Sequence, residues 1–208
     1  QRVALARALA PGTSLVLLDE PFCSLDVEVR SRLRSELSSV LKSCSASAIL
    51  VTHDPHEALA ICDRVAVLRS GEIQQYATPF EMVSNPSNDF IGQFVLQKNI
   101  LPIQYINDFY STCIGKLSLP SDMSISSESV CMFDRNAIRI EPCSNGFFTV
   151  ISKEYRINHY VYTVISDSLK LKSEMNLDTS LSIGDKCKVE AIHEKNFLVL
   201  PENIKCKF

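Results

Sequence analysis

Residues 15–21 have the sequence LVLLDEP, and this stretch decides the fold class of the chain. Four consecutive large aliphatic residues, bounded by turn-forming residues, are typical of a strand that is buried on both faces, as in a parallel sheet. Two acids, Asp19 and Glu20, follow at the carboxyl end of this strand. Buried strands do not normally end on a pair of acids, because two charges there are costly without compensation. The stretch therefore predicts an α/β core with a chemical site at the strand end.

The two acids suit a site that holds a cation and moves a proton. Nucleotide hydrolysis needs both, because one acid contacts Mg²⁺ and the other acts on the attacking water. Asp19 is the candidate Mg²⁺ contact, directly or through water, and Glu20 is the candidate general base. The alternatives are a capping acid in a loop for Asp19 and a surface loop residue for Glu20.

Helical and strand-like segments alternate over the first part of the chain, which favours a parallel α/β core. Asp26 is a plausible N-cap, Asp54-Pro55 begins a short helix, and Ser70-Gly71 is a hairpin signal. The other predicted helices are residues 1–10, 26–44 and 78–86, and the predicted strands are residues 14–18, 48–51, 64–69 and 72–76.

The character of the sequence changes after about Leu96. Short alternating runs separated by turn residues predict an all-β module. These runs are residues 130–140, 147–151, 159–165, 186–192 and 197–200. We therefore expect one domain over residues 1–96 and a second over residues 97–208.

Composition excludes several classes of protein. With 46% apolar and 22% charged residues, the 208-residue chain has the composition of a soluble globular protein of one to two domains. A net charge of −3 gives no broad attraction to nucleic acid. No apolar segment approaches the roughly 20 residues needed to cross a bilayer, so membrane association has to come through a partner. The cysteines show no zinc-ligand spacing.

Three further motifs accompany LVLLDEP: QRVALARAL at residues 1–9, SLD at 24–26 and VTHD at 51–54. In this order and spacing, the set resembles the second half of the nucleotide-binding subunit of an ATP-binding cassette (ABC) importer. This resemblance covers roughly the first half of the chain. It implies the C-terminal part of a P-loop NTPase core. The β module resembles, more loosely, the small barrel-like, OB-like TOBE domain that follows this core in such importers.

The resemblance also implies that the chain is an N-terminally truncated fragment. Gln1 matches the last position of the family's LSGGQ signature, so the phosphate-binding (Walker A) loop, the loop with the γ-phosphate-sensing Gln and the adenine-stacking aromatic would precede it. The composition agrees, because the 6 Gly residues are all isolated and form no Gly-rich phosphate cradle.

Three more site residues come from the resemblance. His53 would reach the γ-phosphate and the attacking water, although a lone His at a strand end is more often structural. Asp26 matches the loop that crosses the dimer interface in ABC ATPases, and this role is compatible with an N-cap. Gln1 is the remnant of the signature, which opens a helix whose positive end faces the ATP of the opposite subunit. His56 has no counterpart in the motif and is interpreted as a solvated helix residue.

The function implied by the resemblance is an ATP-hydrolysing importer subunit that uses ATP and Mg²⁺. Its partners would be a second copy in a homodimer, a transmembrane permease and, indirectly, an extracytoplasmic solute-binding protein. It would lie peripherally on the cytoplasmic face of the plasma (inner) membrane. Residues 90–94 and 99–102 favour ferric iron or an inorganic anion as the solute, with a polyamine or sugar as the alternative.

Two other functions are left open. The chain has catalytic acids without a phosphate loop, so it is also compatible with a catalytically incompetent regulatory or interaction module. A soluble ABC ATPase that acts on ribosomes or DNA is the second rival. A second cassette, coiled-coil arms or basic patches would be expected of that class, and the β module offers none of them.

Overall fold

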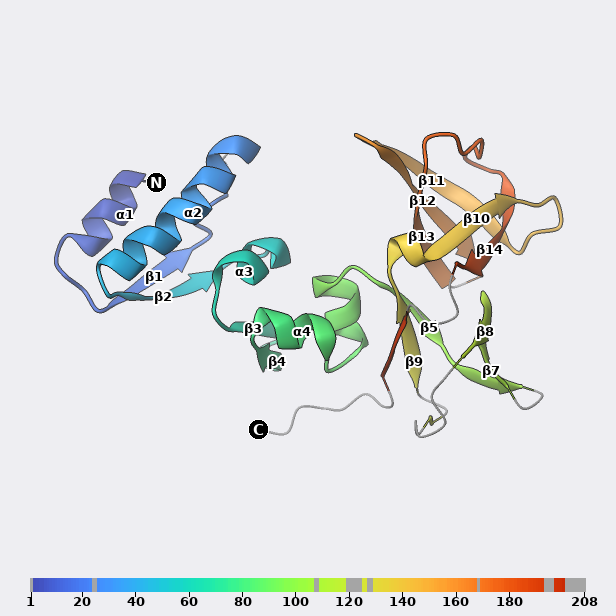
Figure 1. Cartoon of the computed structure of the whole chain (residues 1–208), viewed down its shortest axis with the longest axis horizontal. Coiled ribbons are helices and arrows are strands. Elements are labelled where there is room, and N and C mark those ends of the chain that lie inside the picture. Colours follow the sequence, from blue (N-terminus) through green and yellow to red (C-terminus); the bar gives the residue numbers. More distant parts are fainter. Residues whose placement is uncertain are drawn as a thin grey trace. The chain divides into compact units, whose positions relative to one another are not determined.

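The computed structural model describes residues 2–23, 26–106, 109–118, 125–126, 129–167, 169–192 and 197–200. The chain forms two compact units, Gln1–Asn85 and Pro86–Phe208, and each is described by itself (Figure 1). The change in composition near Leu96 lies inside the second unit. The predicted domain bounds, 1–96 and 97–208, stay a prediction.

The first unit contains helices and strands in alternation, as predicted. In chain order they are α1 (Arg2–Leu9), β1 (Leu15–Asp19), α2 (Val27–Ser43), β2 (Ser47–Val51), α3 (Pro55–Ile61), β3 (Val65–Arg69), β4 (Glu72–Ala77) and α4 (Pro79–Ser84). Strands β1 and β2 pair in parallel, with Asp19 opposite Val51. Because parallel neighbours need a crossover connection, the chain runs through α2 between them. The predicted α/β class is confirmed.

The core of the first unit lies between α2 and one face of the β1–β2 sheet. Phe22, Leu33 and Leu37 are buried there, and Leu18 and Leu50 pack against them. The apolar positions of α2 repeat at helical spacing, so the helix turns one apolar stripe toward the sheet.

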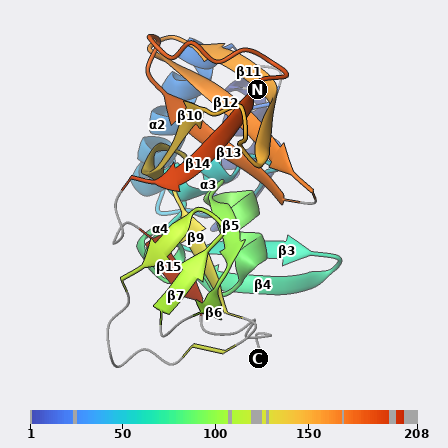
Figure 2. The same ribbon diagram turned by 90° about the vertical axis from the view of Figure 1, so that its right-hand side faces the viewer.

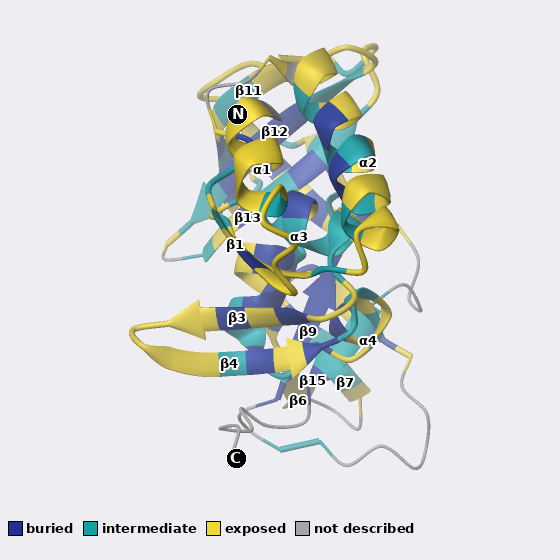
Figure 3. Cartoon of the chain, turned by 90° about the vertical axis from the view of Figure 1, so that its left-hand side faces the viewer, coloured by how far each residue is buried: buried dark blue, intermediate teal, exposed yellow. Residues whose placement is uncertain are grey.

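The prediction that β1 is buried on both faces is wrong in this structure. Val16 is 4% exposed, whereas its neighbour Leu17 is 72% exposed. Figure 3 shows exposed residues on the strand labelled β1. Ile49 and Val51 on β2 are also exposed. Alternate residues of a strand point to opposite faces, and α2 packs on only one of them. The other face has little cover from the described residues, so the aliphatic run is buried on one side.

Two short sequence signals shape the last part of the first unit. Ser70 and Gly71 have φ angles of 53° and 82°, the conformation that a two-residue hairpin turn requires. They join the antiparallel strands β3 and β4. Thr78 and Glu81 form a capping box at the start of α4.

The second unit is built from antiparallel strands, with two short helical segments (Figure 2). These segments are η1 (Ile91–Val95) and η2 (Arg135–Ala137). The strands are β5 (Asn99–Pro102), β6 (Gln104–Ile106), β7 (Phe109–Thr112), β8 (Gly115–Leu117), β9 (Val130–Phe133), β10 (Ile138–Pro142), β11 (Phe148–Arg156), β12 (His159–Ser166), β13 (Leu169–Met175), β14 (Lys186–Ala191) and β15 (Phe197–Leu200).

These strands form three open sheets. Their orders are β10-β14-β11-β12-β13, β15-β9-β5 and β6-β7-β8. The predicted all-β character is confirmed, but the sheets formed by the described strands do not close into a barrel. One large apolar core joins them, and Leu101, Phe133, Tyr162 and Leu171 are fully buried in it.

Two details of the second unit differ from the sequence prediction. The single run predicted over residues 130–140 is two strands, β9 and β10, separated by the helical turn η2. Strands β5 to β8 and β13 were not predicted. None of the helices in the described part of the chain is long and apolar enough to cross a membrane.

Candidate functional site

The candidate site lies where β1 and β2 end side by side. The carboxyl ends of parallel strands meet at one edge of a sheet, which is where open α/β sheets bind ligands. The backbone N–H of Glu20 donates a hydrogen bond of 2.9 Å to the carbonyl oxygen of Val51. This bond carries the parallel pairing one residue beyond Asp19. The segment after β1 is thereby held beside Thr52 and His53, which follow β2.

Glu20 and His53 contact each other directly, although they are distant in the sequence. Glu20 Oε1 accepts the backbone N–H of His53 at 3.1 Å and lies 2.7 Å from His53 Nδ1. Glu20 has a φ angle of 45°, which is uncommon for a residue other than Gly and recurs at functional sites. The structure therefore brings together two of the residues that the sequence singles out.

The contact changes the acid–base behaviour of His53. The hydrogen bond to Glu20, and then the negative charge of Glu20, raise the pKa of His53 above its ordinary value of 6.5. The side chain of His53 is 80% exposed, so solvent screens this effect. A protonated His53 donates to Glu20 through Nδ1, which holds the carboxylate in a fixed orientation.

We expect a pH titration by NMR to give His53 a pKa above 6.5, and Glu20→Gln to bring it back toward 6.5. Because the folded-state pKa is raised, the stabilisation from this contact is fully present below 6.5 and is lost as the pH rises through the folded-state value. Glu72→Gln, in the exposed β3–β4 hairpin, is the control and leaves the His53 titration unchanged. An unaltered His53 pKa in the Glu20 variant would show that the contact does not exist in solution.

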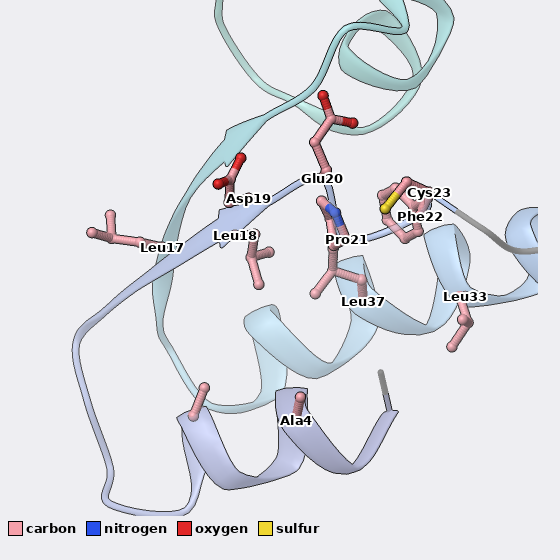
Figure 4. A pocket seen from close by; sticks show the side chains of 11 residues that line it. Ala4, Leu17, Leu18, Asp19, Glu20, Pro21, Phe22, Cys23, Leu33 and Leu37 are labelled. Atoms are coloured by element: carbon pink, nitrogen blue, oxygen red, sulfur yellow. The ribbon is translucent and has the colours of Figure 1, made fainter.

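Asp19 is the last residue of β1 and is exposed. It lines, with Glu20, a pocket of about 390 Å³ that extends between α1, β1 and α2. Figure 4 shows the carboxylates of Asp19 and Glu20 pointing away from the helices that carry Ala4 and Leu37. The remaining lining is mostly apolar, with residues Ala4, Ala8, Leu17, Leu18, Pro21, Phe22, Cys23, Leu33 and Leu37. This pocket offers few partners to a phosphate, so the polar chemistry belongs to the strand ends.

The Asp19 carboxylate suits a magnesium ion that is shared with a nucleotide. Carboxylate oxygens are ligands that Mg²⁺ prefers, and it is commonly held by one or two of them together with waters and substrate phosphates. Within the described residues, no group of three or more His, Cys, Asp or Glu side chains could hold a metal ion. The Asp19 carboxylate, exposed at the end of β1, is a ligand of the kind that a jointly held Mg²⁺ uses.

Asp26 is the N-cap of α2, as predicted. Its Oδ1 accepts the backbone N–H of Val29 at 2.9 Å, which satisfies a donor that the first turn leaves unpaired. The predicted role of Asp26 at a dimer interface is a separate matter and stays a prediction. Gln1 lies outside the described residues, and so do Ser24 and Leu25, which precede Asp26. His56 is exposed on α3, as the sequence interpretation has it.

Sequence reasoning missed a buried acid beside His53. Glu57 on α3 is 4% exposed, and its Oε1 lies 2.9 Å from Nη2 of Arg34 on α2. The Arg34 side chain is 24% exposed. A signal was present, because Glu57 lies four residues before Ile61 and therefore shares its face of the helix. Ile61 packs against the core.

Comparison with known proteins identifies relatives of one kind, although no protein-family model matches the chain. The sulfate/thiosulfate import ATP-binding protein CysA 2 of Chromobacterium violaceum is 47% identical over 50% of this chain and 28% of its own length. The Fe(3+) ions import ATP-binding protein FbpC of Streptomyces coelicolor is 36% identical over 76% of this chain and 46% of its own. The spermidine/putrescine import ATP-binding protein PotA of Spiroplasma citri is 33% identical over 93% and 57%.

These relatives differ in the solute that their names give, and agree in being ATP-binding proteins of import systems. The chain spans between 28% and 57% of their length. The match to the Spiroplasma citri protein extends over 201 residues and therefore includes most of the second unit. The resemblance first noted in four short motifs thus holds over nearly the whole sequence. The chain is therefore a homologue of ABC importer ATP-binding subunits.

Proposed function

We propose that this chain is part of an ATP-hydrolysing subunit that couples ATP binding and hydrolysis to solute uptake through a membrane permease. The contact between Glu20 and His53, beside Asp19 at the ends of two parallel strands, is the observation that carries the proposal. An acid paired with an imidazole at a sheet edge suits proton transfer to and from a bound water.

In the proposed reaction, Glu20 is the general base and His53 orients it. The backbone N–H and the imidazole of His53 both engage Oε1 of Glu20, so the carboxylate is held in one orientation. Glu20 takes a proton from the water that attacks the γ-phosphate, and His53 contacts this phosphate. Asp19 would hold Mg²⁺, which neutralises negative charge on the phosphates when it is bound.

The remaining roles concern the partner subunit and the membrane. Asp26 and Gln1 would face the nucleotide of a second copy, so that two subunits close around ATP and open after hydrolysis. This change would move a transmembrane permease, which receives its solute from an extracytoplasmic binding protein. The subunit would lie on the cytoplasmic face of the membrane. The phosphate loop and the adenine contacts would come from outside these 208 residues, since the chain has no Gly-rich loop.

The proposed solute is ferric iron or an inorganic anion. The named solutes of relatives that match this chain include sulfate or thiosulfate and Fe(3+) ions. A polyamine is the second candidate, because the Spiroplasma citri protein, named for spermidine and putrescine, matches 93% of the chain, including the β unit. Uptake of labelled ferric iron, sulfate and spermidine by cells with and without the gene separates these candidates.

We expect the full-length protein to hydrolyse ATP only when Mg²⁺ is present, and to lose turnover when EDTA removes the metal. The measurement is phosphate release in the presence and absence of the permease. The 208-residue chain alone is the control and is expected to bind no ATP, because its 6 Gly residues are all isolated and the phosphate loop is proposed to lie elsewhere in the protein. A full-length protein without any ATP turnover would instead support the regulatory or interaction module, which is the alternative function.

A further inference from the structure

A buried carboxylate lies directly behind the loop that carries His53. Glu57 is 4% exposed, and both of its oxygens are engaged. Oε1 accepts from Arg34 Nη2 at 2.9 Å, and Oε2 accepts the hydroxyl of Thr52 at 2.8 Å. A buried charge persists only when it is paired and hydrogen-bonded. Glu57 therefore fixes the position of Thr52, which is the residue before His53.

The loop is also held on the other side of His53. Thr52 Oγ1 accepts the backbone N–H of Asp54 at 3.1 Å, and Asp54 Oδ1 accepts the backbone N–H of His56 at 2.9 Å. The residues on both sides of His53 are thus fastened to the first turn of α3. The His53 side chain, at 80% exposure, has little packing of its own to hold it. Its position depends on the flanking bonds together with its two contacts to Glu20.

Arg34 links this arrangement to the segment that carries Glu20. Its Nη2 lies 3.7 Å from Asp54 Oδ2, and its guanidinium carbon lies 5.9 Å from the ring centre of Phe22. Phe22 is 3% exposed and follows Glu20 by two residues. One arginine of α2 therefore contacts both segments whose side chains meet in the candidate site. Arg30, 4.0 Å from Glu57, adds a second positive charge.

We propose that Glu57 is a positioning residue, which acts through Thr52 and Arg34 to place His53 against Glu20. It does not contact the reacting atoms. Its catalytic consequence rests on the proposed function, whereas its effect on the position of His53 does not. Because Thr52 is the link, removing its hydroxyl should release the loop while the charges of Glu57 and Arg34 stay in place.

The first test compares Thr52→Val with Thr52→Ser in the full-length protein. Valine has the shape of threonine without the hydroxyl, and serine restores it. We expect Thr52→Val to lower kcat by about 10²-fold with little change in KM, the size of effect that a displaced catalytic group produces. We also expect exchange of the His53 backbone N–H with solvent to accelerate several-fold. Nitrogen-15-labelled histidine makes this exchange visible by NMR. Thr52→Ser should restore both quantities.

The second test compares Glu57→Gln with Glu36→Gln. Glu36 pairs with Arg32 on α2 at 3.0 Å, but this pair is exposed, so it is a matched control for an acid that faces an arginine. Glu57→Gln keeps a hydrogen-bonding oxygen and removes the charge that holds Arg34. We expect it to accelerate His53 exchange, and Glu36→Gln to leave it unchanged. If the Glu57 variant does not fold, the comparison of Thr52→Val with Thr52→Ser tests the positioning role without it.

The outcomes separate the inference from the proposed function. His53 exchange that is the same in Thr52→Val as in the unaltered protein overturns the positioning role, whatever the turnover. Accelerated exchange together with unchanged kcat supports the placement of His53 and overturns its catalytic consequence. An unaltered protein without ATP turnover refutes the proposed function, and the exchange measurement still decides whether Glu57 places His53.

Discussion

Glu20→Gln is expected to lower the ATP turnover of the full-length protein by about 10²–10⁴-fold, the usual contribution of a general base. Glutamine has nearly the same shape and still accepts the backbone N–H of His53, so the loop geometry is kept. It does not take a proton from water. ATP binding should therefore persist while hydrolysis stops, and the variant should accumulate with bound ATP. Phosphate release and retention of labelled ATP measure the two properties.

Glu72→Gln is the control for this substitution. Glu72 is an exposed acid of the β3–β4 hairpin, outside the candidate site, so the same chemical change there should leave turnover unaltered. Near-normal turnover in the Glu20 variant would remove Glu20 from the role of base. Loss of ATP binding together with hydrolysis would instead indicate that Glu20 holds the nucleotide.

Leu171→Ala is expected to lower the free energy of unfolding of the second unit by about 2–5 kcal/mol. Leu171 on β13 is fully buried in the core that joins the sheets of this unit. Its removal loses the transfer free energy of the side chain and leaves a cavity, because the surrounding strands relax only in part. Five of the 6 tyrosines are in the second unit and the chain has no tryptophan, so tyrosine fluorescence during urea unfolding reports mainly on this unit.

Leu177→Ala is the matched control, since Leu177 is 45% exposed in the turn after β13. It loses the same atoms without leaving a closed cavity, so its effect on unfolding should be much smaller. Equal effects of the two substitutions would show that the packing around Leu171 is not a tight core.

The sequence predicted the features that depend on neighbouring residues. Asp26 caps α2, and Ser70-Gly71 makes the hairpin turn, because N-caps and two-residue turns are fixed by residues only a few positions apart. The sequence singles out Glu20 and His53 as site residues, but it does not predict their direct contact, since they are far apart in the sequence. Each lies within two residues of the end of a strand of the same parallel sheet, so the fold brings them to one edge.

Other features depend on tertiary packing and escaped prediction. The buried position of Glu57 requires α2 to present Arg34, and nothing within a few residues of either side chain reveals this partner. Strand β13 has the sequence LKLKSEM, which contains few large apolar residues and is therefore a weak strand signal. Its position in the sheet is set by its pairing with β12. The exposure of Leu17 likewise depends on which layers cover the sheet, which an aliphatic run does not specify.

The exposed face of the β1–β2 sheet affects the solubility of the chain when it is produced by itself. Leu17 and Ile49 are cross-strand partners on this face, and each strand has a single neighbour among the described strands. Exposed apolar faces and unpaired strand edges promote aggregation. In cells, chaperones and proteases act on polypeptides that expose them. We therefore expect the isolated polypeptide to self-associate as its concentration rises, which light scattering measures.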